Sequence, residues 1–161
     1  MTSDNVMNVD DIMSGSAGKC NMKIDGSRYC LFNIRKFKGE VDTIKKERGL
    51  LGVPKKVTYV AGWKGTWTAT VDFNTSVFAR LMQYYKDTGH FPDMEITTEN
   101  KNFRGSTGAL IVMYREVTLD KAILSMFDVE NQDGMEQDIS GTFGDFEIPQ
   151  GFNDMPGFRI R

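Results

Sequence analysis

Polar and apolar residues alternate most regularly between residues 66 and 73. Every second side chain there is apolar: Trp67, Ala69, Val71 and Phe73. The side chains between them are polar: Thr66, Thr68, Thr70 and Asp72. Because successive side chains of a strand point to opposite faces, this period of two predicts a strand. We expect Trp67, Val71 and Phe73 in the core and the threonines on a hydroxylated face.

The same period recurs upstream, between residues 36 and 42. Charged side chains occupy its alternate positions: Lys36, Lys38, Glu40 and Asp42. Phe37 and Val41 fall between them, which predicts a second strand with one charged and one packed face. The charged face is either a solvated outer surface or the wall of an aqueous channel, because both need the same pattern.

A helical period follows the threonine-rich strand. Asn74-Thr75-Ser76 supplies N-cap chemistry. The apolar residues after it are spaced as on one face of a helix: Val77, Phe78, Leu81, Met82 and Tyr85. We therefore expect one amphipathic helix over residues 76–85, with Phe78 and Leu81 in the core and Gly89 just beyond its end.

The remaining segments predict strands. Asp25-Gly26 is a preferred hairpin turn, here between strands at 19–25 and 28–37. Further strands are expected at 94–98, 108–117, 121–129 and 136–148. About eight strands with one helix, and no strand-helix alternation, predict a mainly β fold, an antiparallel β-sandwich or partly open barrel with one flanking α-helix. We divide the chain into an N-terminal arm (1–18), a sandwich domain (19–150) and a C-terminal tail (151–161).

The segment 45–59 fits neither period. Charged residues flank an apolar centre, Leu50-Leu51-Gly52-Val53, in a stretch without secondary-structure signals. Long structureless loops are uncommon inside compact domains, and an exposed apolar centre needs a surface to cover it. We interpret residues 45–62 as an interaction loop, with a flap that folds on its own subunit as the alternative.

Composition and net charge argue against two classes of function, tight nucleic-acid binding and membrane spanning. The 161 residues suit one domain, and a formal net charge of -2 provides no basic footprint for tight nucleic-acid binding. The chain has no apolar run long enough to span a membrane, and its N-terminus has no export signal. We expect a cytosolic product without membrane partners.

Catalytic and metal chemistry is not indicated. His90 stands alone in a turn, so no triad forms around it, and Cys20 and Cys30 lack the further ligands of a metal site. The two cysteines flank the predicted hairpin and are expected to be reduced strand residues rather than a disulfide. We predict a protein without enzymatic activity, metal or cofactor, although paired carboxylates for sugar hydrolysis stay open.

Several segments, in order, carry a family resemblance. They are Met13-Ser14-Gly15-Ser16-Ala17-Gly18 before Ile24-Asp25-Gly26, then Gly62-Trp63-Lys64-Gly65-Thr66, the single helix, and Gly141-Thr142-Phe143-Gly144-Asp145-Phe146-Glu147-Ile148-Pro149. Residues 6–150 resemble tail tube proteins of contractile-tailed phages and phage-derived R-type bacteriocins, the PBSX-like and diffocin-like branch. The extended 45–59 segment and the tail after Phe152 depart from that pattern.

The resemblance implies a structural protein of the virion tail, assembled in the bacterial cytoplasm. Six copies would form a ring, and rings would stack helically into a hollow conduit for DNA and tape-measure protein. The implied partners are further copies of the chain, the tail sheath protein, and the baseplate and tail terminator proteins. DNA would pass through the lumen without specific binding.

Two sets of residues follow from this interpretation. Alternation off the packed face assigns six side chains to the lumen: Lys38, Glu40, Asp42, Thr66, Thr68 and Thr70. Segments with apolar residues that the domain does not bury are assigned to contact between rings: Met7, Ile12, Met13, Lys46, Arg48, Leu50, Leu51, Val53 and Tyr59.

Two alternatives remain. One is the tube of a related contractile injection system, such as an R-type bacteriocin or a type VI-like machine. The other is a carbohydrate-binding β-sandwich with Tyr59, Trp63 and Trp67 as its aromatic platform, which the position of Trp67 on the core face disfavours.

Overall fold

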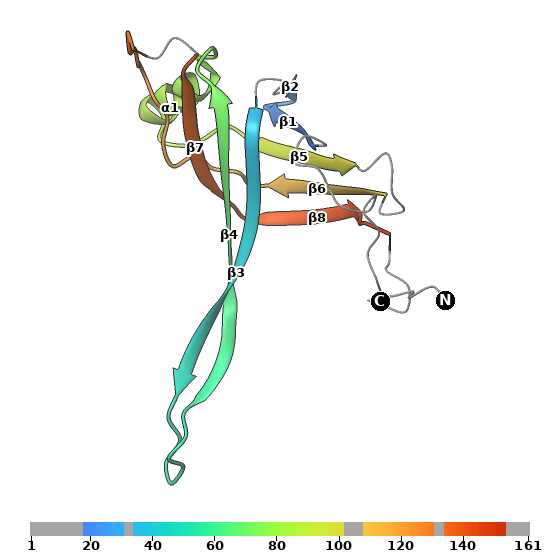
Figure 1. Ribbon diagram of the computed structural model, residues 1–161. Helices are drawn as coiled ribbons and strands as arrows, with labels where there is room; N and C mark the ends of the chain where they lie inside the picture. Colours follow the sequence, from blue (N-terminus) through green and yellow to red (C-terminus); the bar gives the residue numbers. More distant parts are fainter. Residues whose placement is uncertain (1–17, 31–33, 102–107, 131–133, 154–161) are drawn as a thin grey trace, which may run out of the picture.

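The computed structural model describes residues 18–30, 34–101, 108–130 and 134–153. These residues form eight strands and one helix, with the strands in two antiparallel sheets (Figure 1). The larger sheet has the order β2-β1-β5-β6-β8 and the smaller has the order β3-β4-β7. The predicted mainly β architecture is confirmed, and the two sheets do not close into a barrel.

The strand bounds show which predictions hold. The five-stranded sheet contains β1 (Gly18–Ile24), β2 (Ser27–Cys30), β5 (Met94–Lys101), β6 (Ala109–Arg115) and β8 (Asp145–Gln150). The three-stranded sheet contains β3 (Ile34–Arg48), β4 (Val57–Asp72) and β7 (Glu136–Phe143). The predicted hairpin at Asp25-Gly26 is present, and both residues have positive φ angles, 47° and 86°.

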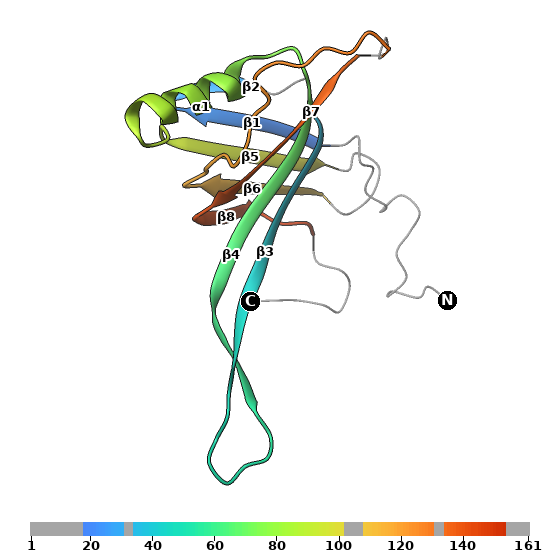
Figure 2. The same cartoon turned by 90° about the vertical axis from the view of Figure 1, so that its left-hand side faces the viewer.

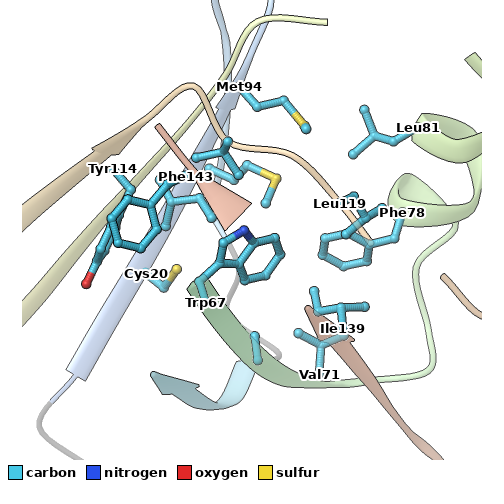
Figure 3. Close-up of a cluster of buried hydrophobic side chains, with 14 residues drawn as sticks. Cys20, Trp67, Val71, Phe78, Leu81, Met94, Tyr114, Leu119, Ile139 and Phe143 are labelled. Atoms are coloured by element: carbon cyan, nitrogen blue, oxygen red, sulfur yellow. The ribbon is translucent and has the colours of Figure 1, made fainter. Parts of the chain in front are cut away.

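The core lies between the sheets and under the helix (Figure 3). Trp67 and Val71 of β4 are buried there, as are Phe78 and Leu81 of the helix, whereas Phe73 at the end of the alternating stretch is half-buried. The indole Nε1 of Trp67 donates a hydrogen bond to the backbone oxygen of Thr118, 3.1 Å away. The largest side chain of the core is thus both packed and satisfied in its polar group.

The helix α1 (Val77–Thr88) extends one turn beyond the predicted end. Its N-cap residue Ser76 makes no side-chain cap hydrogen bond, and the Val77 N–H donates instead to Thr75 Oγ1 over 3.3 Å. At the other end Gly89 has a φ of 81° and donates its N–H to Tyr85 O over 2.7 Å. The helix covers one end of the sandwich (Figure 2).

Several predictions about secondary structure were wrong in their bounds or type, including the 28–37 strand, whose two ends belong to β2 and β3 in different sheets. The 45–59 segment, predicted as a loop, is strand at both ends, because β3 and β4 stay paired as far as Arg48 and Val57, and only residues 49–56 form a loop. The 121–129 segment is not a strand; only Lys121 forms an isolated bridge, to Ser140. The 136–148 segment divides at Gly144 into β7 and β8, which belong to different sheets.

Candidate assembly surfaces

Strands β3 and β4 continue past the sandwich as a projecting hairpin, which we define as residues 44–62. A register shift between Ile44 and Lys45 marks the point where the pair leaves the body. Figures 1 and 2 show the two strands extending alone, away from the rest of the fold. Every residue from 41 to 61 is exposed. A two-stranded ribbon of this kind has little stability of its own in water.

The tip of the projecting hairpin is a tight turn that displays an apolar side chain. Val53 N–H donates to Leu50 O over 3.2 Å, and Gly52 has a φ of 80°, as the third residue of a type II turn requires. Leu51, the second residue, is 105% exposed. The hairpin carries further exposed apolar side chains: Ile44, Leu50, Val53, Val57, Tyr59 and Val60. Such a concentration on one element is typical of an interaction site.

The six side chains assigned to the lumen share one face of the three-stranded sheet. Lys38 lies opposite Thr68, and Glu40 lies opposite Thr66, in register pairs. Strand β7 extends these rows, because Thr70, Thr68 and Thr66 pair in turn with three polar residues: Asp138, Ser140 and Thr142. The sequence analysis predicted a strand here, and the alternation of Gln137 and Ile139 with polar residues agrees with one, but it did not place this strand beside β4 on the polar face.

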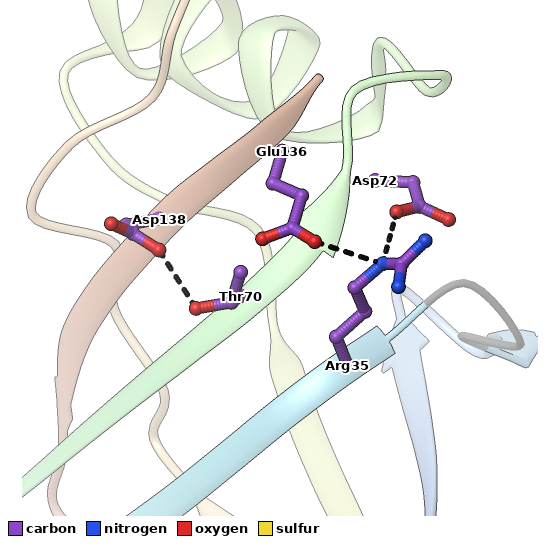
Figure 4. A network of polar contacts seen from close by, with 5 residues as sticks. All are labelled: Arg35, Thr70, Asp72, Glu136 and Asp138. Atoms are coloured by element: carbon purple, nitrogen blue, oxygen red, sulfur yellow. Dashed lines mark hydrogen bonds and ion pairs between the residues drawn. The ribbon is translucent and has the colours of Figure 1, made fainter. Parts of the chain in front are cut away.

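An ionic network crosses this polar face near the helix end of the sheet (Figure 4). The Nε atom of Arg35 donates to Asp72 Oδ1 at 2.6 Å and lies 3.0 Å from Glu136 Oε1. The hydrogen bond and charge of Asp72, with the charge of Glu136, raise the pKa of Arg35 above its ordinary value. Thr70 Oγ1 donates to Asp138 Oδ1 over 2.7 Å. One cation thus ties β3 to both other strands of the sheet.

One lysine on the polar face has a carboxylate partner. Lys38 Nζ lies 3.5 Å from Glu40 Oε2, which gives this lysine the acidic partner that a channel wall would require. The face carries four cationic side chains, Arg35, Lys36, Lys38 and Lys64. Its anionic side chains number five: Glu40, Asp42, Asp72, Glu136 and Asp138. The face is therefore close to neutral and slightly acidic.

The sandwich is open along one side. Strand β3 pairs with β4 on one edge only among the described strands. Beside it lies an open groove of about 1380 Å³ between the sheets, lined by residues that include Cys20, Phe37, Asn100, Val112 and Tyr114. An open strand edge next to a partly apolar groove offers both hydrogen-bonding groups and packing surface to a neighbouring chain.

Catalytic and binding chemistry is sparse in the described residues. They contain no group of three His, Cys, Asp or Glu side chains able to hold a metal, and no helix long and apolar enough to cross a membrane. His90 packs edge-on against Tyr84 at a centroid distance of 5.6 Å. Asn21, not Cys20, lies opposite Cys30 in the hairpin register. Trp67 is buried, so Tyr59, Trp63 and Trp67 do not form an aromatic platform.

Comparison with known proteins identifies the family of the protein that carries these surfaces. The family model described as "Phage tail tube protein" matches residues 5–150. The chain belongs to this family of phage tail tube proteins. It is a structural subunit of a tail tube. A search of curated protein sequences finds no match.

Two solved structures show the same fold at low sequence identity, and a third matches more weakly. A chain of the anti-feeding prophage baseplate matches with a TM-score of 0.57 and 6% identity, over 81% of this chain and 91% of the other. A chain of the tail of an empty gene transfer agent particle matches with a TM-score of 0.50 and 11% identity, over 86% and 100%. Hcp1 from Flavobacterium johnsoniae matches with a TM-score of 0.46 and 13% identity, over 84% and 98%.

The structure describes six of the nine residues that were predicted to make contact between rings of this tube protein. Lys46, Arg48, Leu50, Leu51, Val53 and Tyr59 all lie on the projecting hairpin and are exposed. Met7, Ile12 and Met13 lie outside the described residues. The hairpin and the polar sheet face are therefore the two surfaces that an account of assembly has to explain.

Proposed function

We propose that six copies of this tube protein close into a ring and that rings stack head to tail into a hollow tube. The open edge of β3 and the groove beside it support ring closure, because a neighbouring sheet would pair that edge and cover that groove. The number six is supported by the two solved structures with the better match, which are described as "6-fold symmetrised" and of "C6 symmetry".

The polar face of the three-stranded sheet is proposed to line the lumen, with Lys38, Glu40, Asp42, Thr66, Thr68 and Thr70 joined by the β7 residues Asp138, Ser140 and Thr142. A conduit for DNA has to avoid clusters of unpaired cations, since Lys and Arg contacts to phosphate hold DNA in a salt-dependent way. The near-neutral charge and the pairing of Lys38 with Glu40 support this role.

The wider role follows from a tube of this kind. We infer that DNA and tape-measure protein pass through the lumen, that baseplate and terminator proteins close the ends, and that a contractile sheath surrounds the tube. The role is mechanical, with no catalytic step and no cofactor. The same tube chemistry serves a phage, an R-type bacteriocin or a related contractile injection system.

The projecting hairpin is proposed to make the contact between rings. It is the observation that carries the proposal, because none of the described residues covers residues 41–61, and contact with another molecule would bury them. The N-terminal residues Met7, Ile12 and Met13 are proposed to contribute to the same contact.

Electron microscopy of the purified chain tests this function. The wild-type protein is expected to give six-fold rings and tubes with a stained lumen. Leu50→Asp combined with Leu51→Asp should give rings that do not elongate, because charge replaces the apolar tip. Thr58→Asp, which adds charge to the same exposed hairpin without removing an apolar group, serves as the matched control and should elongate normally. Undiminished elongation by the double variant would remove the hairpin from the ring contact.

Cysteine labelling tests the lumen assignment separately. Thr68→Cys should react with a large polymeric maleimide in free subunits and resist it in long tubes, because the reagent enters only at the ends. Gln83→Cys, exposed on the helix, should react in both states. The wild-type chain supplies the background from its own cysteines. Equal labelling of both positions in tubes would place Thr68 outside the lumen.

A further inference from the structure

The connection between β6 and β7, residues 116–135, exposes three large apolar side chains in succession. Leu124 is 75% exposed, Phe127 is 89% exposed and Val129 is 93% exposed. With Leu51, they are the most exposed large apolar side chains among the described residues. We call these three residues the receiving surface.

The start of the same connection is held firmly against the body. Val117 and Leu119 are buried in the core. Thr118 N–H donates to Thr142 O over 2.8 Å, and Asp120 N–H donates to Ser140 O over 2.7 Å, as an additional strand along the free edge of β7 would do. The connection is therefore anchored at 117–121 and displays its apolar residues beyond that anchor.

The receiving surface and the hairpin tip lie at opposite ends of the molecule. In Figures 1 and 2 the connection, drawn in orange, lies beside the helix at one end, and the projecting hairpin extends from the other. Two different patches at opposite ends of one subunit can join only head to tail, and such heterologous contacts build filaments. The proposed head-to-tail stacking of rings requires a contact of this kind.

A shallow hollow lies next to Leu124. It has a volume of about 300 Å³ and is bounded by the start of the helix and by the connection, through residues that include Phe73, Thr75, Ala79, Ile123 and Leu124. The turn at the hairpin tip displays Leu51 and is flanked by Leu50 and Val53. A protruding apolar tip and a partly apolar hollow are complementary in shape and chemistry.

The two surfaces also differ in the sign of their charge. The projecting hairpin carries five cations, Lys45, Lys46, Arg48, Lys55 and Lys56, and one anion, Glu47. The described connection around the receiving surface carries three anions between residues 120 and 130, Asp120, Asp128 and Glu130, and one cation, Lys121. All these residues are exposed. Complementary charge favours this pairing over contact between like ends.

We propose that the receiving surface binds the projecting hairpin of a second copy of this chain in the adjacent ring. The proposal rests on the tube function above and names the partner of its hairpin. Each single contact is small, but ring symmetry repeats it around the stack, so that weak contacts act together. Within the tube both apolar patches are then covered. The hairpins stay exposed only at one end of the tube, and the receiving surfaces only at the other end.

The decisive test mixes two variants that each lack one of the two surfaces. Leu124→Asp with Phe127→Asp removes the receiving surface at side chains that are already exposed, so folding is retained. These rings should not elongate alone, and rings with Leu50→Asp and Leu51→Asp should not elongate alone. Mixed together, the two kinds of ring should form pairs of rings and nothing longer, because one intact hairpin face meets one intact receiving face.

Ser125→Asp is the matched control in the connection. It adds charge of the sign already present there and leaves the three apolar side chains in place, so tubes should form as in the wild type. A second test exchanges the charges. Lys55→Glu with Lys56→Glu should shorten tubes at least about tenfold, and Asp128→Lys with Glu130→Lys in the same chain should restore them, because the pairing is electrostatically matched again.

The outcomes separate this proposal from the tube function. Normal elongation of the Leu124→Asp, Phe127→Asp variant, with a wild type that forms tubes, overturns the proposal and leaves the tube function intact. Loss of ring closure in that variant, with the subunit still folded, assigns the surface to contacts within a ring and also overturns it. A wild type that stays monomeric at all concentrations contradicts the tube function and this proposal together.

Discussion

Strands β3 and β4 pass through two regions that differ in side-chain burial: the sandwich and the projecting hairpin. Inside the sandwich β4 contributes Trp67 and Val71, which are 2% and 0% exposed, and side-chain burial holds the strand in place. In the projecting hairpin the same two strands have no buried side chain, and most of the exposed large apolar side chains of β3 and β4 lie there. The body is stabilised by its own core, whereas we propose that the hairpin is stabilised by contact with another molecule. Substitutions in the body should therefore change stability, and substitutions in the hairpin should change assembly.

Of the substitutions that test this comparison, one at Trp67 in the body should have the largest effect on stability. Trp67→Ala should lower the free energy of unfolding by about 3–5 kcal/mol, because it leaves a cavity in the core and removes the hydrogen bond to Thr118. Urea unfolding followed by circular dichroism measures this. Trp63→Ala, where the ring is 43% exposed, is the matched control and should cost clearly less. Equal losses in the free energy of unfolding at both positions would contradict the structure, in which Trp67 belongs to the core and Trp63 is exposed.

Close backbone packing at Gly141 gives the second largest effect. A Cβ atom at this residue would run into the backbone carbonyl oxygen of Thr118, which is itself held to β7. Gly141→Ala should therefore lower the free energy of unfolding by about 1–3 kcal/mol. Gly151→Ala, where a Cβ meets nothing within 4 Å, should be close to neutral. Thermal unfolding of both variants compares them directly, and a neutral Gly141→Ala would contradict the close contact between the connection and β7.

A buried polar group offers a gain in stability. Gln137 is 2% exposed in β7, and neither its side-chain oxygen nor its nitrogen has a hydrogen-bond partner among the described residues. Gln137→Met should raise the free energy of unfolding by about 1 kcal/mol, because it removes the cost of unsatisfied polar atoms at similar volume. Gln83→Met on the exposed helix face is the control. A loss of stability at Gln137 would indicate a partner for its amide.

The smallest effect is confined to alkaline pH. Burial, opposed by the hydrogen bond with Thr98, raises the pKa of Tyr114 above its ordinary value of 10.0. The unfolded chain therefore ionises first, so the stability from this tyrosine is intact below pH 10.0 and is lost as pH rises through the higher folded pKa. Tyr114→Phe cannot ionise, so its free energy of unfolding should fall less above that pH. Parallel losses in both proteins would contradict the shift.

The local patterns predicted the body well and the surfaces only in part. Alternation over residues 66–73 was sufficient for β4, and Asp25-Gly26 was sufficient for the first hairpin, since both signals act between sequence neighbours. The pairing of β7 with β4 joins residues about seventy positions apart, as Thr70 and Asp138 illustrate, and no local period encodes it. The sequence therefore indicated two strands of the polar face and not the third.

The projecting hairpin and the connection show where periodicity is least informative. The register shift at Ile44 and Lys45 breaks the alternation, so the strand ends on both sides of residues 49–56 looked like part of one loop. Leu124, Phe127 and Val129 looked like the apolar positions of a strand, although in the structure they are exposed. The apolar residues that we propose to contact another copy resemble core residues in the sequence, and only the fold shows that none of the described residues covers them.

Hydrogen exchange read by mass spectrometry, on free subunits and on assembled tubes, tests the central claim most directly. Backbone amides of the projecting hairpin should exchange rapidly in subunits, because a two-stranded ribbon opens easily, and at least about tenfold more slowly in tubes. Amides of Trp67 and Val71 should be protected in both states. Equal exchange of the hairpin in subunits and tubes would contradict the claim that another ring completes it.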